Sequence, residues 1–124
     1  MEFRLELFVE DLQRSISFFE EVIGLTFHNK TEVSAIIKME NFSLLLTSDN
    51  VLKENHYFKK DGLRPKGKGV EVVILLDNIE QTYQRVLDKN YPVESSLKMQ
   101  SWGMKDFRII DPDGYYLRLS LYKD

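Results

Sequence analysis

Hydrophobic and polar residues alternate along the first segment of the chain. Every second side chain is apolar in F-R-L-E-L-F-V, residues 3–9, which is typical of a strand with one buried face. Apolar residues then recur at helical spacing, at Leu12, Ile16, Phe19 and Ile23. Asp11 is a suitable N-cap, and Gly24 follows the last apolar position, where glycine commonly ends a helix. The first 24 residues therefore predict a strand followed by a helix.

The same pattern returns 67 residues later. V-E-V-V-I-L-L (70–76) predicts a second strand, and Asn78 is the N-cap of a second helical row, formed by Ile79, Tyr83, Val86 and Asn90. Three strand-like segments follow each helix: 25–29, 33–39 and 42–47 in the first half, and 93–98, 104–110 and 115–122 in the second. Each half therefore reads β-α-β-β-β. We expect an α+β fold in which the two modules form a curved mixed sheet, with the helices on its convex face and a concave cleft on the other.

Between the halves lies a segment rich in glycine and lysine, residues 55–69. Its composition predicts a connector and not a folded element. Neither half is large enough to bury a core alone, so we expect residues 1–124 to form a single domain. Module one spans about 1–54 and module two about 70–124.

Composition excludes several classes of function. The formal net charge is −3, and no block of basic residues marks a nucleic-acid surface. No apolar run is long enough to span a bilayer, and the opening residues do not resemble a signal peptide, so we expect a cytoplasmic protein with no membrane partner. The chain has no cysteine, which excludes disulfides and thiolate metal sites.

Strand alternation also predicts which side chains face the cleft. The apolar rows suit the helix side of the sheet, so the polar rows must face the other way. The predicted ligand-binding residues are Arg4, Glu6, Phe8, Glu71, Asp106, Arg108, Tyr116 and Arg118. Trp102, just before Gly103, is a further candidate, although tryptophan is equally common in cores and dimer interfaces.

Two longer motifs carry a family resemblance. The motifs are V-E-D-L-Q-R-S-I-S-F-F-E-E-V-I-G-L near the start and W-G-M-K-D-F-R-I-I-D-P-D-G-Y-Y-L-R-L near the end. Together with the duplicated β-α-β-β-β pattern, they resemble the vicinal oxygen chelate superfamily. This group includes glyoxalase I, extradiol dioxygenases, fosfomycin-resistance enzymes and bleomycin-resistance proteins. The resemblance covers nearly the whole chain.

The resemblance also implies where a metal would be held. Metalloenzymes of the superfamily use His, Gln or Glu on the first strand of each half and a Glu on the last strand; these positions correspond here to Arg4, Glu71 and Arg118, with a fourth near Leu45. Arginine offers no lone pair to a metal and brings a positive charge. One carboxylate is too few for a catalytic divalent ion, so we expect neither a metal nor another cofactor.

Two interpretations of this charged cluster remain open. Glu71 can pair with Arg4 and Arg118 for purely structural reasons, because polar groups on a partly buried sheet face need partners. Alternatively, one arginine is left to bind a ligand.

The bleomycin-resistance proteins are most similar, since they also carry arginine in place of the last glutamate. They imply a metal-free homodimer that holds an aromatic or anionic small molecule, as in antibiotic resistance, with Trp102 stacked on a flat ligand at the cleft edge. The alternative is a lyase, isomerase or dioxygenase of the glyoxalase type with an atypical or absent metal site. Its catalytic residues are unknown, although Glu6 and Asp106 are possible proton acceptors.

The remaining candidates lie at the edges of the elements. His28 and His56 are expected at the surface, because neither is placed on the predicted cleft floor. Tyr57 and Phe58 in the connector are either a lid over the cleft or anchors for a long loop.

Overall fold

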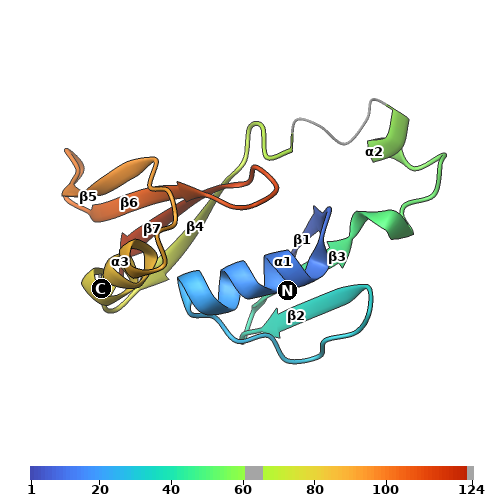
Figure 1. Cartoon of the computed structure of the whole chain (residues 1–124), viewed down its shortest axis with the longest axis horizontal. Coiled ribbons are helices and arrows are strands. Elements are labelled where there is room, and N and C mark those ends of the chain that lie inside the picture. Colours follow the sequence, from blue (N-terminus) through green and yellow to red (C-terminus); the bar gives the residue numbers. More distant parts are fainter. Residues whose placement is uncertain (61–65, 123–124) are drawn as a thin grey trace. The chain divides into compact units, whose positions relative to one another are not determined.

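Residues 1–60 and 66–122 are described by a computed structural model of the chain (Figure 1). In chain order the elements are β1 (Phe3–Val9), α1 (Leu12–Ser17), a π-helix (Phe18–Ile23), β2 (Ser34–Lys38), β3 (Phe42–Ser48), a 3₁₀ turn (Asp49–Val51), α2 (Tyr57–Lys60), β4 (Glu71–Leu76), α3 (Ile79–Asp88), β5 (Ser95–Met99), β6 (Lys105–Ile110) and β7 (Tyr116–Leu121). They form two compact units, one around β1–β3 and one around β4–β7. This confirms the α+β class; that the two modules complete one domain stays a prediction.

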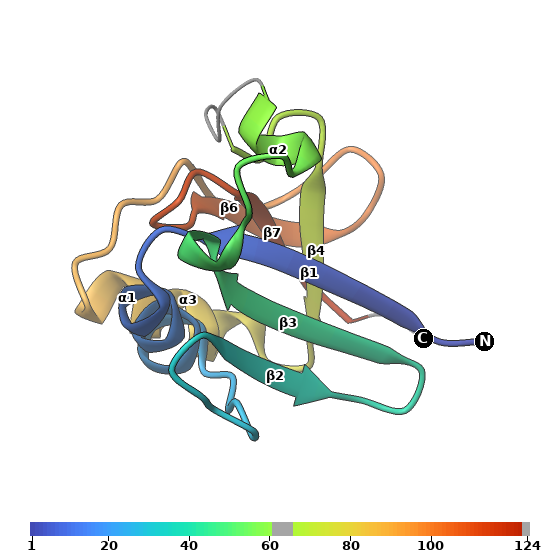
Figure 2. The same ribbon diagram turned by 90° about the vertical axis from the view of Figure 1, so that its right-hand side faces the viewer.

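The first unit is built on a mixed sheet of order β1-β3-β2, in which β1 runs parallel to β3 and β2 antiparallel (Figure 2). The predicted cap is present, because the Asp11 carboxylate accepts a hydrogen bond from the Arg14 backbone N–H at 3.1 Å. The core combines apolar residues from the helical segment and one sheet face: Leu7, Val9, Leu12, Ile16, Phe19, Ala35, Ile37, Leu44 and Leu46. Gly24, at φ 97°, ends the helical segment as expected.

The strand expected at residues 25–29 was wrong. Only one backbone bond of the β type is seen there, from His28 N–H to the Ile36 carbonyl at 2.9 Å. The Glu20 carboxylate takes the Phe27 N–H at 3.0 Å and pairs with Lys30. The Glu20 side chain therefore accepts from a backbone N–H that would otherwise pair with a neighbouring strand, and the segment is an irregular connection between the π-helix and β2.

The second unit shows the complete β-α-β-β-β order. Its mixed sheet has the order β4-β7-β6-β5, with β4 parallel to β7 and the other pairs antiparallel. The predicted cap holds, since Asn78 accepts from the Gln81 N–H at 3.1 Å. Asn90 lies beyond α3 at φ 54° and does not belong to the helix.

Helix α3 covers one face of this sheet. Its Ile79 and Val86 are fully buried, and Tyr83 packs edge-on against Phe107 of β6 at 4.9 Å between ring centroids. Phe107 pairs with Leu119 across the ladder, so the apolar row of β7 faces the helix as predicted. The polar rows of β4, β6 and β7 therefore share the opposite face.

The connector expected over 55–69 is partly folded, which corrects the prediction. Tyr57–Lys60 forms the short helix α2, and Phe58 packs edge-on against Phe8 at 5.5 Å. Phe58 is therefore an anchor on the first unit. Residues 61–65 lie outside the described residues. Across the part of the chain that is described, no helix is long and apolar enough to cross a membrane.

Candidate functional site

Three predicted site residues share the face of the first sheet that lies opposite α1: Arg4, Glu6 and Phe8. Each already has a partner within this unit. Arg4 Nε donates to Ser43 Oγ at 3.0 Å, and Thr47 Oγ1 donates to the Glu6 carboxylate at 2.7 Å. Phe8 packs against Phe58, and His56 lies 6.2 Å from the Phe8 ring centroid. The expected contact between Arg4 and Glu71 stays a prediction, because the two residues belong to separate units.

The polar face of the second sheet is defined by its register. Three cross-strand rows make up this face: Glu71, Tyr116 and Ile110; Val73, Arg118, Arg108 and Ser95; and Leu75, Ser120, Asp106 and Lys98. Five of the predicted site residues lie in these rows, and the structure brings them together as the sequence predicted. We call this surface the polar face.

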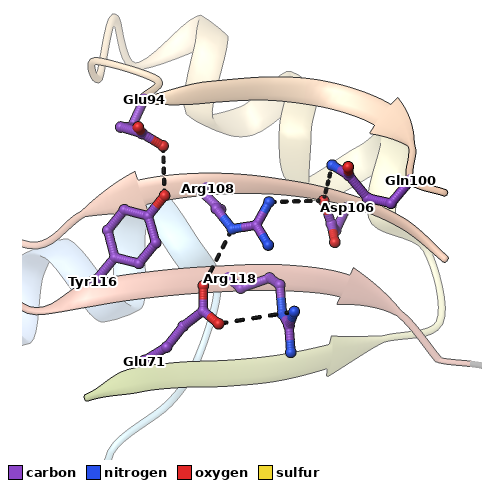
Figure 3. Close-up of polar contacts among 7 residues, drawn as sticks. All are labelled: Glu71, Glu94, Gln100, Asp106, Arg108, Tyr116 and Arg118. Carbon is purple, nitrogen blue, oxygen red and sulfur yellow. Dashed lines mark hydrogen bonds and ion pairs between the residues drawn. The ribbon is translucent and has the colours of Figure 1, made fainter. Parts of the chain in front are cut away.

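Glu71 lies between two guanidinium groups (Figure 3). Its Oε2 accepts from Arg108 Nε at 3.1 Å, and its Oε1 is 3.8 Å from Arg118 Nη1. The pairing with Arg118 was predicted, whereas the nearer partner is Arg108. The acid is therefore neutralised by cations from two neighbouring strands.

Asp106 is the deepest charged group of the polar face and is 0% exposed. Its Oδ1 accepts from Gln100 Nε2 at 2.7 Å and from Arg108 Nη1 at 3.5 Å (Figure 3). Its Oδ2 is buried and has no hydrogen-bond partner among the described residues. Arg108 thus bridges Asp106 and Glu71. Desolvation lowers the pKa of Arg108, but the hydrogen bond to Glu71 and the two nearby negative charges outweigh it, so the pKa is raised.

Arg118 is less well satisfied than Arg108. Its ion pair with Glu71 is longer than a hydrogen bond, and its Nε is buried with no acceptor among the described residues. A guanidinium carries five N–H donors in a fixed plane, and leaving a buried donor unpaired costs about 1–3 kcal/mol. Arg118 therefore retains donors that a bound molecule can use.

Aromatic side chains flank this charged network. Trp102 is 55% exposed, and the guanidinium carbon of Arg108 lies 6.0 Å from its ring centroid. Tyr116 donates from its hydroxyl to Glu94 Oε2 at 2.6 Å. Burial raises the pKa of Tyr116 to about 12, and the hydrogen bond to Glu94 acts in the same direction. Tyr116 is therefore a protonated donor at neutral pH.

The turn D-P-D-G places Arg118 on the polar face. Asp111 Oδ1 accepts from the backbone N–H groups of Asp113 and Tyr115 at 2.9 and 2.8 Å, and Gly114 completes the turn at φ 104°. Burial raises the pKa of Asp111 to about 6, against the opposing effect of these backbone hydrogen bonds. The Asp111 side chain thus closes the turn that sets the start of β7.

Two residues of the network were missed by the sequence reasoning. Gln100 and Glu94 flank β5, one at each end, and hold Asp106 and Tyr116 respectively. Alternation within a strand says little about residues that stand just outside it. The signal that could have located Gln100 is the turn from Gln100 to Gly103, which closes the β5–β6 hairpin beside Asp106. Its backbone hydrogen bond runs from the Gly103 N–H to the Gln100 carbonyl at 3.0 Å.

The residues of the polar face do not fit a divalent metal. No group of three His, Asp or Glu side chains suited to a metal occurs among the described residues. Glu71 is engaged by two guanidinium groups, and Arg118 stands where a third ligand would be needed. A cation placed there would face the positive charges of Arg108 and Arg118, and Asp106, the other carboxylate of these strands, is fully buried and already bonded to Gln100 and Arg108. We therefore derive no chemical step through a metal.

Comparison with known proteins places the chain in a family. Solved structures share its fold at low sequence identity. A glyoxalase/bleomycin resistance protein/dioxygenase from Nocardioides is 19% identical with a TM-score of 0.76, covering 100% of this chain and 84% of its own. A glyoxalase-related enzyme from Fulvimarina pelagi is 13% identical with a TM-score of 0.78, covering 98% and 88%. A protein of unknown function from Agrobacterium tumefaciens is 19% identical with a TM-score of 0.78, covering 97% and 92%.

No curated protein matches the chain in sequence. The sequence profile of one family, however, matches residues 3–119, which is nearly the whole chain. The chain belongs to the Glyoxalase/Bleomycin resistance protein/Dioxygenase superfamily.

Proposed function

We propose that this chain is a metal-free small-molecule binding protein that holds an aromatic or anionic compound on the polar face of the second sheet. The proposed contact residues are Glu71, Trp102, Asp106, Arg108, Tyr116 and Arg118, which all belong to the second unit; ligand binding by Arg4, Glu6 and Phe8 of the first unit stays a prediction. The superfamily includes both binding proteins and enzymes by its description, so the choice between them rests on the residues themselves.

The observation that carries the proposal is the incomplete pairing of Arg118. Its Nε has no partner among the described residues, and its only ion pair spans 3.8 Å. Glu71 is held more closely by Arg108, at 3.1 Å, so Arg118 is not required to neutralise that acid. The Arg118 side chain is 28% exposed although its Nε is buried, so a carboxylate, phosphate or carbonyl oxygen of a ligand would bind its terminal nitrogens.

The aromatic preference follows from Trp102. More than half of its surface is exposed, and one side of its ring already faces the Arg108 guanidinium. A planar ligand can stack on the same indole without displacing a core residue. Within the network, the carboxylates of Glu71, Glu94 and Asp106 outnumber the guanidinium groups of Arg108 and Arg118, so we expect affinity to come from directed hydrogen bonds and stacking and not from net charge.

A second candidate function is supported by Asp106. Its Oδ2 is buried and has no hydrogen-bond partner among the described residues, so it could accept a proton only if a substrate or water reaches it. The protein would then be a lyase, isomerase or dioxygenase of the glyoxalase type with an atypical or absent metal site. This candidate predicts turnover that is lost in Asp106→Asn, whereas a binding protein keeps its ligand unchanged.

The test is a ligand screen that follows a metal analysis. We expect freshly purified protein to contain no stoichiometric metal and to be stabilised against heat by some aromatic carboxylates or phosphates in a panel, since a ligand bound only to the folded state raises its melting temperature. Arg118→Ala should abolish the shift, whereas Arg14→Ala, which removes an exposed arginine from α1, should not. One equivalent of tightly bound metal, or shifts that survive in Arg118→Ala, would refute the proposal.

A further inference from the structure

A cleft opens at the end of the second sheet where β4 begins and β6 ends. Its volume is ≈ 490 Å³, and it lies between the segment Lys66–Glu71 on one side and Ile110, Gly114 and Tyr116 on the other. Glu71 and Tyr116 border both the cleft and the polar face. The cleft therefore continues the proposed binding surface past the first row of the sheet.

One wall of the cleft is fixed by a buried ion pair. Lys66 Nζ lies 3.2 Å from Asp113 Oδ1, and the two side chains are 5% and 0% exposed. Breaking a buried pair is costly because it leaves an uncompensated charge, so this contact holds the segment firmly against the D-P-D-G turn. Gly67 packs against the same turn, because a Cβ at this position would meet the Gly114 carbonyl oxygen at 2.7 Å.

The polar side of the cleft carries hydrogen-bond donors that have no partner among the described residues. Lys68 is exposed, and its ammonium forms no hydrogen bond or ion pair with any described residue. The backbone N–H groups of Lys68 and Gly69 likewise donate to no described group, since the turn's own bond runs from Val70 N–H to the Gly67 carbonyl. Lysine and free backbone N–H groups are the usual partners of oxyanions.

The other side of the cleft is apolar. Val70 and Ile110 are both exposed, and Tyr116 adds its ring. Glu71 does not make the cleft acidic, because Arg108 and Arg118 neutralise it. The Lys66 and Asp113 charges cancel in the same way, which leaves Lys68 as the unbalanced charge of the lining. A cation beside exposed apolar surface suits an anionic group on a compact apolar body.

We propose that this cleft is a subsite for an oxyanion, carboxylate or phosphate, carried on a short apolar chain or ring. It rests on the proposed function in that it extends the same ligand surface, with which it shares Glu71, Ile110 and Tyr116. Lys68 and the Lys68 and Gly69 N–H groups hold the oxyanion, while Val70 and Ile110 contact the apolar body.

Hexanoate and its neutral isostere hexanamide test the subsite directly. We expect hexanoate to shift the Gly67 and Gly69 amide signals in two-dimensional NMR, and hexanamide to bind more weakly. Lys68→Gln should weaken hexanoate binding by roughly fivefold at low salt, as for one exposed ion pair of about 1 kcal/mol. Lys89→Gln, which removes an exposed lysine beyond α3, should leave binding unchanged.

Two results would overturn the subsite: equal affinity for the acid and the amide, or equal losses in the two lysine variants. A titration with inorganic phosphate then distinguishes the two oxyanions. If hexanoate shifts the Gly67 and Gly69 amide signals and phosphate does not, the subsite is assigned to carboxylates; the reverse result assigns it to phosphates. Arg118→Ala keeps this test distinct from that of the proposed function. Hexanoate shifts should persist in that variant even if binding to the polar face is lost.

Discussion

Asp111→Asn offers a direct test of the turn that positions Arg118. The Asp111 side chain is buried, 3% exposed, and burial raises its pKa from 3.8 to about 6. The folded state thus holds the proton more tightly than the unfolded chain does. As the pH rises through this interval, the unfolded state loses its proton first, so the free energy of unfolding falls.

The size of the effect follows from the two pKa values. A difference of about two units corresponds to about 3 kcal/mol, at 1.36 kcal/mol for each unit. This contribution is fully present below pH about 4 and is lost once the pH exceeds about 6. Asparagine keeps an oxygen for the N–H groups of Asp113 and Tyr115 but cannot ionise.

Urea unfolding of the wild type and the variant at several pH values measures this difference. We expect the variant to gain stability relative to wild type by about 3 kcal/mol between pH about 4 and about 7. Comparing the two proteins removes the contributions of other carboxylates, such as Glu20 and Glu80, whose pKa values are lowered by hydrogen bonds. Asp77→Asn, an exposed change, should track wild type. A constant difference between Asp111→Asn and wild type across this range would refute a raised pKa at Asp111.

Two further sets of substitutions test the packing around the polar face and the cleft. Gly67→Ala and Gly69→Ala both place alanine at positive φ, which costs about 1–2 kcal/mol of stability in each variant. Only at Gly67 would the added Cβ also meet backbone, at 2.7 Å from the Gly114 carbonyl oxygen. Gly67→Ala should therefore lose about 1–3 kcal/mol more than Gly69→Ala in urea unfolding. Equal losses would contradict the close approach. Arg108→Ala should cost about 3 kcal/mol, because it leaves Asp106 buried beside one cation fewer, and adding Asp106→Asn should recover part of this loss in a double-mutant cycle.

The strands and helix caps were predictable because they depend on local patterns. Alternation located β1 at residues 3–9, and Asp11 and Asn78 cap the helices as their side-chain chemistry suggests. Alternation failed at 25–29, where the Glu20 side chain takes the Phe27 N–H. A carboxylate seven residues away along the chain leaves no mark in the strand pattern.

The site was predictable only as far as strand faces determine it. Alternation placed Glu71, Arg108 and Arg118 on one surface, and the register confirms this. It could not tell which arginine would lie nearest Glu71, because that depends on how far neighbouring strands are offset. The contacts of Gln100 and Lys66 depend on turns, where composition suggests only an irregular connection. The homodimer stays a prediction.

The polar face is proposed to bind an aromatic anion without a metal. Trp102 is the only tryptophan, so its indole N–H gives a single NMR signal that reports on this face. In a titration with 2-naphthoate in the presence of a chelator, we expect the Trp102 indole and the Arg118 Nε–H signals to move together and saturate at one dissociation constant. The neutral 2-naphthamide should bind more weakly. Unmoved signals, or movement that begins only when Zn²⁺ or Mn²⁺ replaces the chelator, would contradict the account.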